Sequence, residues 1–150
     1  MRLEMVARFL KLESTMALAT ATAEGSGRVA PLFYLAQEGL RLFWFSSPAS
    51  EHSGNLERNR QAAVAVYHPT AEWKKIRGVQ MRGSVSTITD DAARRAVAKA
   101  YAKRFQLGKR FAGEISKCTL YCFQPEWVRY LDNSKRFGYR FELSPGEPRK

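Results

Sequence analysis

Two short turns divide the first third of the chain into three strand-like segments, and this pattern constrains the fold more than any other feature. Residues 15–23, 28–36 and 40–46 carry alternating apolar side chains, threonines and aromatic rings, which favour strands. The turns between them, at 24–27 and 37–39, are too short for a crossover between parallel strands. The first 46 residues are therefore predicted to contain an antiparallel meander.

Proline and glycine place limits on the strands. Pro31 lies inside the second segment, so we expect that strand at a sheet edge or bulged at this residue. Gly78 and Gly83 indicate bulges or a close approach of backbone. Later strands are predicted at 61–68, at 74–88, at 112–132 with a break around Pro125, and at 137–143.

Three helices are predicted among these strands, at 2–13, at 51–58 and a third that is capped by Thr89 or Asp90 and runs to about Phe105. Ser50 is the expected N-cap of the second helix. Six or seven strands in hairpin order with interspersed helices predict a mainly β, α+β fold, an antiparallel barrel or strongly coiled sheet. The 150-residue length fits a single domain, assigned to 1–143, with a flexible tail at 144–150.

The net charge of +11 favours anionic partners such as nucleic acid, phosphates or a membrane surface. The cations are dispersed along the chain, which argues against one dense nucleic-acid groove. Nucleic-acid binding by a non-enzymatic basic barrel is therefore the alternative and not the leading interpretation. The N-terminus lacks the pattern of a signal peptide, and no segment has the length and apolarity of a membrane-spanning helix. We expect a cytoplasmic protein without a membrane partner.

Few residues are suited to catalysis by themselves. The chain has two histidines, His52 and His68, and no metal-ligand cluster, nucleophile elbow or phosphate-binding glycine loop. Cys118 and Cys122 are expected to share one face of a strand as small apolar residues. Trp44, Trp73 and Trp127 are expected to serve as packing in the core or an interface. Any redox chemistry would require a bound cofactor.

Hydroxyl side chains are concentrated where the third strand meets the second helix. Ser46, Ser47 and Ser50 follow the aromatic segment 40–45, and the helix beginning at Glu51 adds free backbone N–H groups. This arrangement suits a phosphate group. Serines are also common in turns and helix caps, and that simpler interpretation stays open.

Taken in order, residues 18–85 resemble the FMN-binding split β-barrel of the pyridoxamine-phosphate-oxidase-like superfamily. The resemblance is carried by the glycine turn, the strand that ends in Ser46–Ser47, the sequence NLERN at 55–59, and Trp73 before a long strand ending in glycine. The stretches 76–83, 100–105 and 130–143 are similar to a bacterial subgroup of small cytoplasmic proteins in that superfamily. The resemblance implies an antiparallel six- or seven-stranded split β-barrel with peripheral helices.

The resemblance also implies FMN as cofactor, bound between the two subunits of a homodimer, and a possible oxidoreductase activity on a small molecule. Haem or a deazaflavin is the alternative ligand for such a barrel. The implied cofactor-binding residues are Ala30, Pro31, Leu32, Phe33, Phe45, Ser46, Ser47, Ser50, His52, Arg77 and Gln80. No catalytic residue and no metal ligand is assigned.

Three positions depart from the family pattern. Glu51 and His52 stand where many flavin-binding relatives have basic residues, and Gly78 stands where the oxidase has a glutamine. A glutamate beside a phosphate is unfavourable unless it points to solvent. Arg77 and Gln80 face opposite sides of a regular strand, so both meet one cofactor only if a bulge occurs at Gly78.

Overall fold

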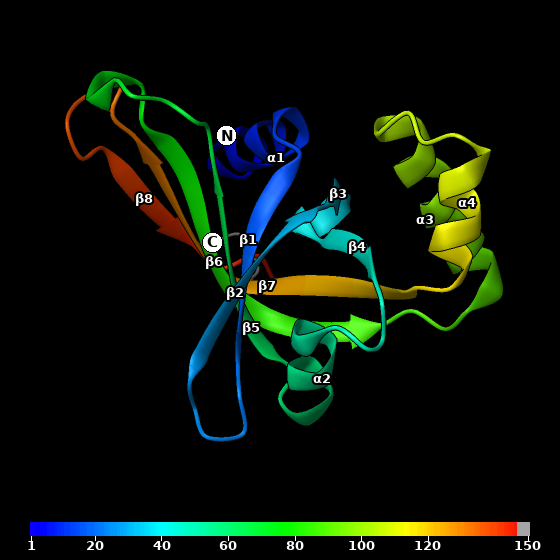
Figure 1. Ribbon diagram of the computed structural model, residues 1–150. Coiled ribbons are helices and arrows are strands. Elements are labelled where there is room, and N and C mark those ends of the chain that lie inside the picture. The colour runs from blue at the N-terminus through cyan, green and yellow to red at the C-terminus, as the bar shows by residue number, and fades with distance from the viewer. Residues whose placement is uncertain (147–150) are drawn as a thin grey trace.

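All strands of the protein belong to one antiparallel sheet in the computed structural model, which describes residues 1–146 (Figure 1). The tail predicted at 144–150 thus lies partly outside the described residues. The strands are β1 (Thr15–Ala21), β2 (Gly27–Phe33), β3 (Leu35–Ala36), β4 (Leu42–Ser46), β5 (Gln61–Tyr67), β6 (Arg77–Thr87), β7 (Thr119–Asp132) and β8 (Arg140–Leu143).

The sheet curls into an open half-barrel, which confirms the predicted antiparallel split barrel with peripheral helices. Seven strands form a continuous path in the order β2-β1-β5-β6-β7-β4-β3, and β8 pairs with β7 beside that path. The strand that contains Pro31 is the edge strand β2, as its missing amide hydrogen required. Pro31 lies opposite Ala17 of β1.

Four α-helices surround the sheet: α1 (Arg2–Leu12), α2 (Glu51–Arg58), α3 (Asp91–Arg104) and α4 (Lys109–Ser116). Two short 3-10 helices, η1 (Glu38–Leu40) and η2 (Trp73–Lys75), lie in connections. The prediction of a strand beginning at residue 112 is wrong, because α4 occupies this stretch. Cys118 follows α4 and only Cys122 lies in β7, so the two cysteines do not share a strand.

A hydrogen-bonded arginine explains the helix that sequence patterns missed. The Arg94 guanidinium on α3 donates to the carbonyl oxygens of Ile115 (3.0 Å) and Cys118 (2.8 Å) at the end of α4. The same guanidinium lies 5.3 Å from the centre of the Phe45 ring. These contacts stabilise the end of α4, and they come from a residue more than twenty positions away in the chain.

The hydrophobic core lies inside the curl. Alternate residues of β1, β5 and β6 point inward and are nearly inaccessible, among them Leu18, Val66 and Met81. Trp44 of β4 is fully buried in the same cluster, in line with its predicted packing role, whereas Trp73 is 54% exposed. A smaller cluster fills the space between α3 and the β4–β7 face.

The two long strands β6 and β7 pair along their whole lengths with one irregularity. Arg82 pairs with Trp127, but Gly83 pairs with Pro125, so one extra residue bulges from β7. The predicted break around Pro125 is therefore only a bulge within one continuous strand. Gly78 keeps regular pairing with both neighbouring strands, and the bulge expected there does not occur.

Candidate functional site

The polar residues predicted between β4 and α2 come together as a hydrogen-bonded cluster. The Nε2 atom of His52 lies 2.8 Å from the Ser46 hydroxyl and 3.2 Å from the Ser50 hydroxyl. The Ser50 side chain accepts a hydrogen bond from the Ser53 amide, so it is the N-cap that the sequence predicts. The Ser53 hydroxyl, which sequence analysis missed, donates to the Ser47 carbonyl oxygen (2.8 Å).

The start of α2 adds the electrostatics of a helix N-terminus to this cluster. Glu51 and His52 occupy the first two helical positions, where backbone N–H groups have no partner within the helix. Those amides and the helix dipole favour a negative charge nearby. Ser46 and Ser53 are buried and Ser50 is half-buried, so the hydroxyls are held in place. The cluster can therefore bind an anion mostly through neutral donors.

His52 adds hydrogen-bonding capacity to the cluster without a permanent charge. Burial lowers the pKa of its imidazole, while the neighbouring Glu51 carboxylate opposes that shift. Because the folded protein disfavours the protonated ring, the stability that His52 contributes is present above its ordinary pKa. That contribution is lost as the pH falls through the lowered pKa.

We expect the titration of His52 to report on an anion at this cluster. In a pH titration followed by NMR, the His52 ring should titrate below the ordinary histidine value, and added inorganic phosphate should raise its pKa. A His52 pKa that stays the same in phosphate and in chloride would contradict anion binding here.

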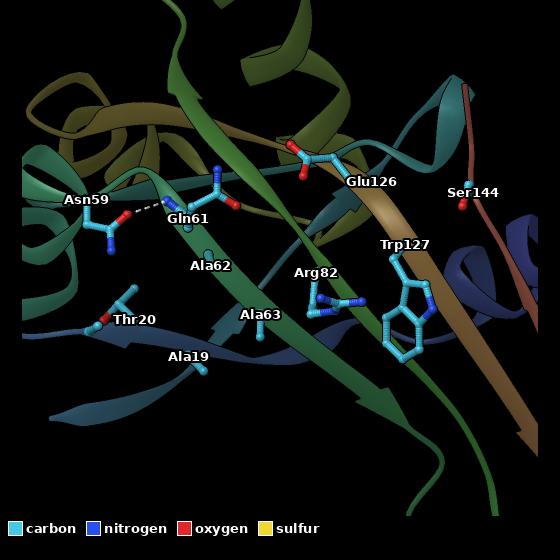
Figure 2. Close-up of a pocket in the computed structure, with 11 residues that line it drawn as sticks. Ala19, Thr20, Asn59, Gln61, Ala62, Ala63, Arg82, Glu126, Trp127 and Ser144 are labelled. Atoms are coloured by element: carbon cyan, nitrogen blue, oxygen red, sulfur yellow. Dashed lines mark hydrogen bonds between the residues drawn. The ribbon is translucent and has the colours of Figure 1, made fainter. Parts of the chain in front are cut away.

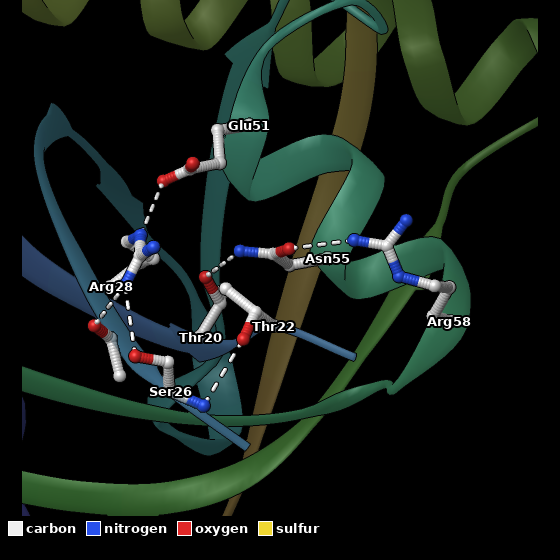
Figure 3. Close-up of polar contacts among 8 residues, drawn as sticks. Thr20, Thr22, Ser26, Arg28, Glu51, Asn55 and Arg58 are labelled. Atoms are coloured by element: carbon white, nitrogen blue, oxygen red, sulfur yellow. Dashed lines mark hydrogen bonds and ion pairs between the residues drawn. The ribbon is translucent and has the colours of Figure 1, made fainter. Parts of the chain in front are cut away.

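The neighbouring arginine resolves the unfavourable placement of Glu51. The Glu51 carboxylate lies 3.3 Å from the Arg28 Nε atom at the start of β2, and both side chains are largely solvent-exposed (Figure 3). Asn55 anchors the helix by donating to the Thr20 hydroxyl (3.1 Å). Glu51 thus points to Arg28 and solvent, and Arg28 brings a cation to this side of α2 that sequence analysis had not selected.

The other predicted strand residues divide between two environments. On β2, Ala30 and Leu32 are partly buried, whereas Pro31 and Phe33 are exposed. The Phe33 ring stacks on Phe105 at the end of α3, with 4.6 Å between ring centres. β2 leaves one backbone edge unpaired in the sheet, where a flat ligand could bond.

Phe45 lies on the opposite side of β4 from Ser46. Its ring meets the buried Tyr101 of α3 edge to face, with 5.2 Å between ring centres. This is the alternation expected of neighbouring residues in a strand. Phe45 therefore positions α3, and the serine cluster is formed from the other face of β4.

Arg77 and Gln80 lie far from the serine cluster within one protomer. Gln80 pairs with Arg129 of β7, and Ser46 pairs with Thr119 of the same strand, so ten residues of β7 separate them. At about 3.3 Å per residue this is roughly 30 Å. Gln80 is exposed and lines a hollow of about 320 Å³ with Gly78 as part of its floor. One protomer therefore does not bring all the predicted residues to one ligand.

A larger hollow of about 620 Å³ lies on the outer face of β1, β5 and β6, the face turned away from the core (Figure 2). Its floor includes Ala19 and Ala63, and Arg82 lies beside Trp127 at its wall. The guanidinium of Arg82 lies 4.7 Å, and that of Arg129 4.9 Å, from the centre of the Trp127 ring. The alternating small residues of 61–67 are the sequence signal that could have revealed this face.

Two further searches concern the described residues alone. Residues 1–146 contain no group of three His, Cys, Asp or Glu side chains placed to hold a metal ion. None of the helices within the same range is long and apolar enough to cross a membrane.

Comparison with known proteins shows which family the sequence of this chain matches. Residues 3–132 match the sequence model of a family described as pyridoxamine 5'-phosphate oxidase. A UPF0306 protein from Yersinia pseudotuberculosis is 27% identical over 148 residues, which cover 96% of this chain and 94% of that protein.

Solved structures share the fold at low sequence identity. A pyridoxamine 5'-phosphate oxidase-related, FMN-binding protein from Nostoc punctiforme has a TM-score of 0.67 and 14% identity, covering 95% of this chain and 88% of that one. A haem-binding protein from Mycobacterium smegmatis has a TM-score of 0.68 and 22% identity, covering 93% of this chain and 58% of that one. Proteins with this fold thus include binders of FMN and of haem.

Proposed function

The chain belongs to the pyridoxamine 5'-phosphate oxidase family, and on that premise we propose that it is a flavoprotein oxidoreductase that binds FMN between the two subunits of a homodimer. The observation that carries the proposal is the cluster of Ser46, Ser50 and His52 at the start of α2. The chemistry of these donors fits the phosphate group of FMN. When bound, FMN supplies a ring that accepts and donates electrons.

Different groups at and near the cluster would bind the phosphate, supply positive charge and orient the ring system. The Ser46 hydroxyl and the amides of Glu51 and His52 would donate hydrogen bonds to phosphate oxygens. The Ser50 hydroxyl donates to the Ser47 carbonyl oxygen (2.9 Å) in the free protein and would turn from it to donate to the phosphate. Arg28 would supply positive charge nearby, in place of the basic residues that relatives carry on the helix. The exposed backbone of β2, from Ala30 to Phe33, would orient the ring system. None of these groups needs to change its protonation state for FMN to bind.

Two features of the protomer support the proposed homodimer: an apolar sheet face and the separation of Gln80 from the serine cluster. Ala17, Ala19, Ala63 and Ala65 give the outer sheet face a smooth apolar surface, which we call the alanine face. Val29, 71% exposed, and Tyr67, 61% exposed, flank it. An exposed apolar sheet face of this kind is suited to packing against a second copy. Such a dimer would allow Gln80 of one protomer to approach the serine cluster of its partner.

An absorbance spectrum of the purified protein tests the cofactor. We expect the two visible bands of oxidised flavin to persist through dialysis, or to appear when FMN is added and the excess removed. A Soret band would instead identify haem, the ligand of one structural relative. A spectrum with no visible band before or after adding FMN would reject the flavoprotein proposal.

The Ser50→Ala variant tests the phosphate site itself. Loss of one hydrogen bond to a charged group should weaken FMN binding by roughly tenfold to a hundredfold. Riboflavin, which lacks the phosphate, should bind wild type and variant with equal affinity, measured by flavin fluorescence quenching. An equal loss for both ligands would place the effect on the ring or the fold and not on the phosphate.

A further inference from the structure

Two aromatic side chains stand exposed at one end of the molecule. Trp73 of η2 is 54% exposed and Phe137 of the β7–β8 turn is 78% exposed. Their rings meet edge to face, with 5.8 Å between ring centres. Ile76, 40% exposed, lies three positions after Trp73 in the chain. We call Trp73, Ile76 and Phe137 the aromatic tip, and exposed apolar groups of this size in one place indicate a contact surface.

The aromatic tip is held in place by hydrogen bonds between its two turns. The buried Asn133 side chain donates to the Trp73 carbonyl oxygen (3.0 Å), and the Asn133 amide donates to the Ile76 carbonyl oxygen (2.9 Å). The Asn133 side-chain oxygen also accepts from the Gly138 amide (3.0 Å). These bonds join η2 to the β7–β8 turn. The exposure of the rings is therefore a property of the fold and not of a frayed loop.

Positive charge surrounds the tip. Lys74 and Lys75 lie in η2, and Lys135 and Arg136 lie in the facing turn, all of them exposed. Glu72, which pairs with Lys75 at 2.7 Å, is the one acidic residue in 72–76 and 134–137, so these four cations are only partly neutralised. In Figure 1 the turns lie at the end of the arm that β6, β7 and β8 form, away from α2 and α3.

We propose that the aromatic tip docks on an anionic lipid bilayer. Tryptophan and phenylalanine rings partition into the region between headgroups and acyl chains, and flanking lysines are attracted to anionic headgroups. The rings of Trp73 and Phe137 project from the end of an arm and line neither of the two hollows described above, whereas Ile76 also lines the hollow that contains Gln80. A projecting knob suits insertion into a soft surface, whereas a nucleobase needs a slot in which to stack. A peripheral contact of this kind requires no spanning helix, and it would replace the expectation from the sequence that the protein has no membrane partner.

Binding to lipid vesicles tests the proposal and does not depend on FMN. The wild-type protein should co-sediment with vesicles that contain phosphatidylglycerol and not with neutral phosphatidylcholine vesicles. Its tryptophan emission should shift to the blue on binding, and Trp73→Phe should abolish the shift while vesicle binding persists. Absence of co-sedimentation with anionic vesicles, or equal binding to both vesicle types, would overturn the proposal.

Charge variants separate the tip from general attraction by a basic protein. Lys74→Gln/Lys75→Gln should weaken vesicle binding by roughly tenfold or more. Lys109→Gln/Arg110→Gln on α4 removes the same charge from another exposed site and should leave binding nearly unchanged. Equal losses in the two double variants would overturn the proposal. The proposal would also be overturned if Trp73→Ala kept vesicle binding but lost affinity for a single-stranded oligonucleotide. The same holds if Trp73→Ala kept vesicle binding but changed the oligomeric state.

Discussion

Replacing Gly83 with alanine is expected to destabilise the protein by about 3 kcal/mol or more, the largest effect we expect from a single methyl group. A Cβ atom at this position would overlap the carbonyl oxygen of Gln124 and lie 2.9 Å from the Cα of Pro125. Both are backbone atoms of the paired strand β7, so no side chain can rotate away. The bulge in β7 brings that backbone close to Gly83, and relief would require separating the two longest strands.

Urea unfolding measures this effect, and a second glycine provides the control. Gly113 lies within α4, and a Cβ added there would meet no atom within 4 Å. Gly113→Ala should therefore stabilise the protein slightly, by about 0.5–1 kcal/mol, through the better helix propensity of alanine. A Gly83→Ala protein that unfolds within 1 kcal/mol of wild type would show that β7 moves more freely than its pairing indicates.

The sequence predicts those parts of the fold that depend on neighbouring residues. The alternation in 15–46 predicts the meander, and Pro31 predicts an edge strand, because each acts on its own backbone. Ser50 as N-cap is predicted for the same reason. Ser46 ends a strand and His52 begins the next helix, only six positions later in the chain. Their clustering is therefore predictable as well. Local rules thus account for the serine cluster as well as for most strands.

Features that depend on distant residues were not predictable. α4 ends where the Arg94 side chain meets its last carbonyl groups, and nothing within 109–118 indicates that contact. β7 continues through Pro125 because a bulge fits the proline opposite Gly83. The Arg28–Glu51 ion pair joins a hairpin to a helix. Each of these arises from tertiary contact, which the patterns of a single sequence do not contain.

The separation of the candidate site into two parts is the clearest example of an arrangement that the patterns of a single sequence do not reveal. The resemblance implies both the serine cluster and Gln80, yet roughly 30 Å of strand β7 lies between them in one protomer. In the homodimer that we propose, a second copy would complete the site. Its integrity would then depend on the alanine face, none of whose residues was expected to contact the cofactor.

Placing a charge on that face is expected to abolish the dimer and to weaken FMN binding strongly. Ala19 pairs with Val29 and Ala63 and shares a hollow with Arg82, so Ala19→Glu would place a longer, charged side chain in the middle of this face. The symmetry of a homodimer repeats the substitution in each copy, so two longer, charged side chains would have to be accommodated at one interface. Light scattering should show a monomer, and FMN affinity should fall by roughly a hundredfold.

The matched control is Ala112→Glu, which makes the same change on the exposed surface of α4 and should leave a flavin-bound dimer. Ala19 points out of the sheet, away from the core, so the Ala19→Glu monomer should keep a cooperative thermal transition near that of wild type. This combination of a folded chain, a lost dimer and a lost cofactor is what a shared site requires. A variant that becomes monomeric yet binds FMN as wild type does would place the whole site within one protomer. A variant that stays dimeric with FMN bound would move the subunit contact away from the alanine face.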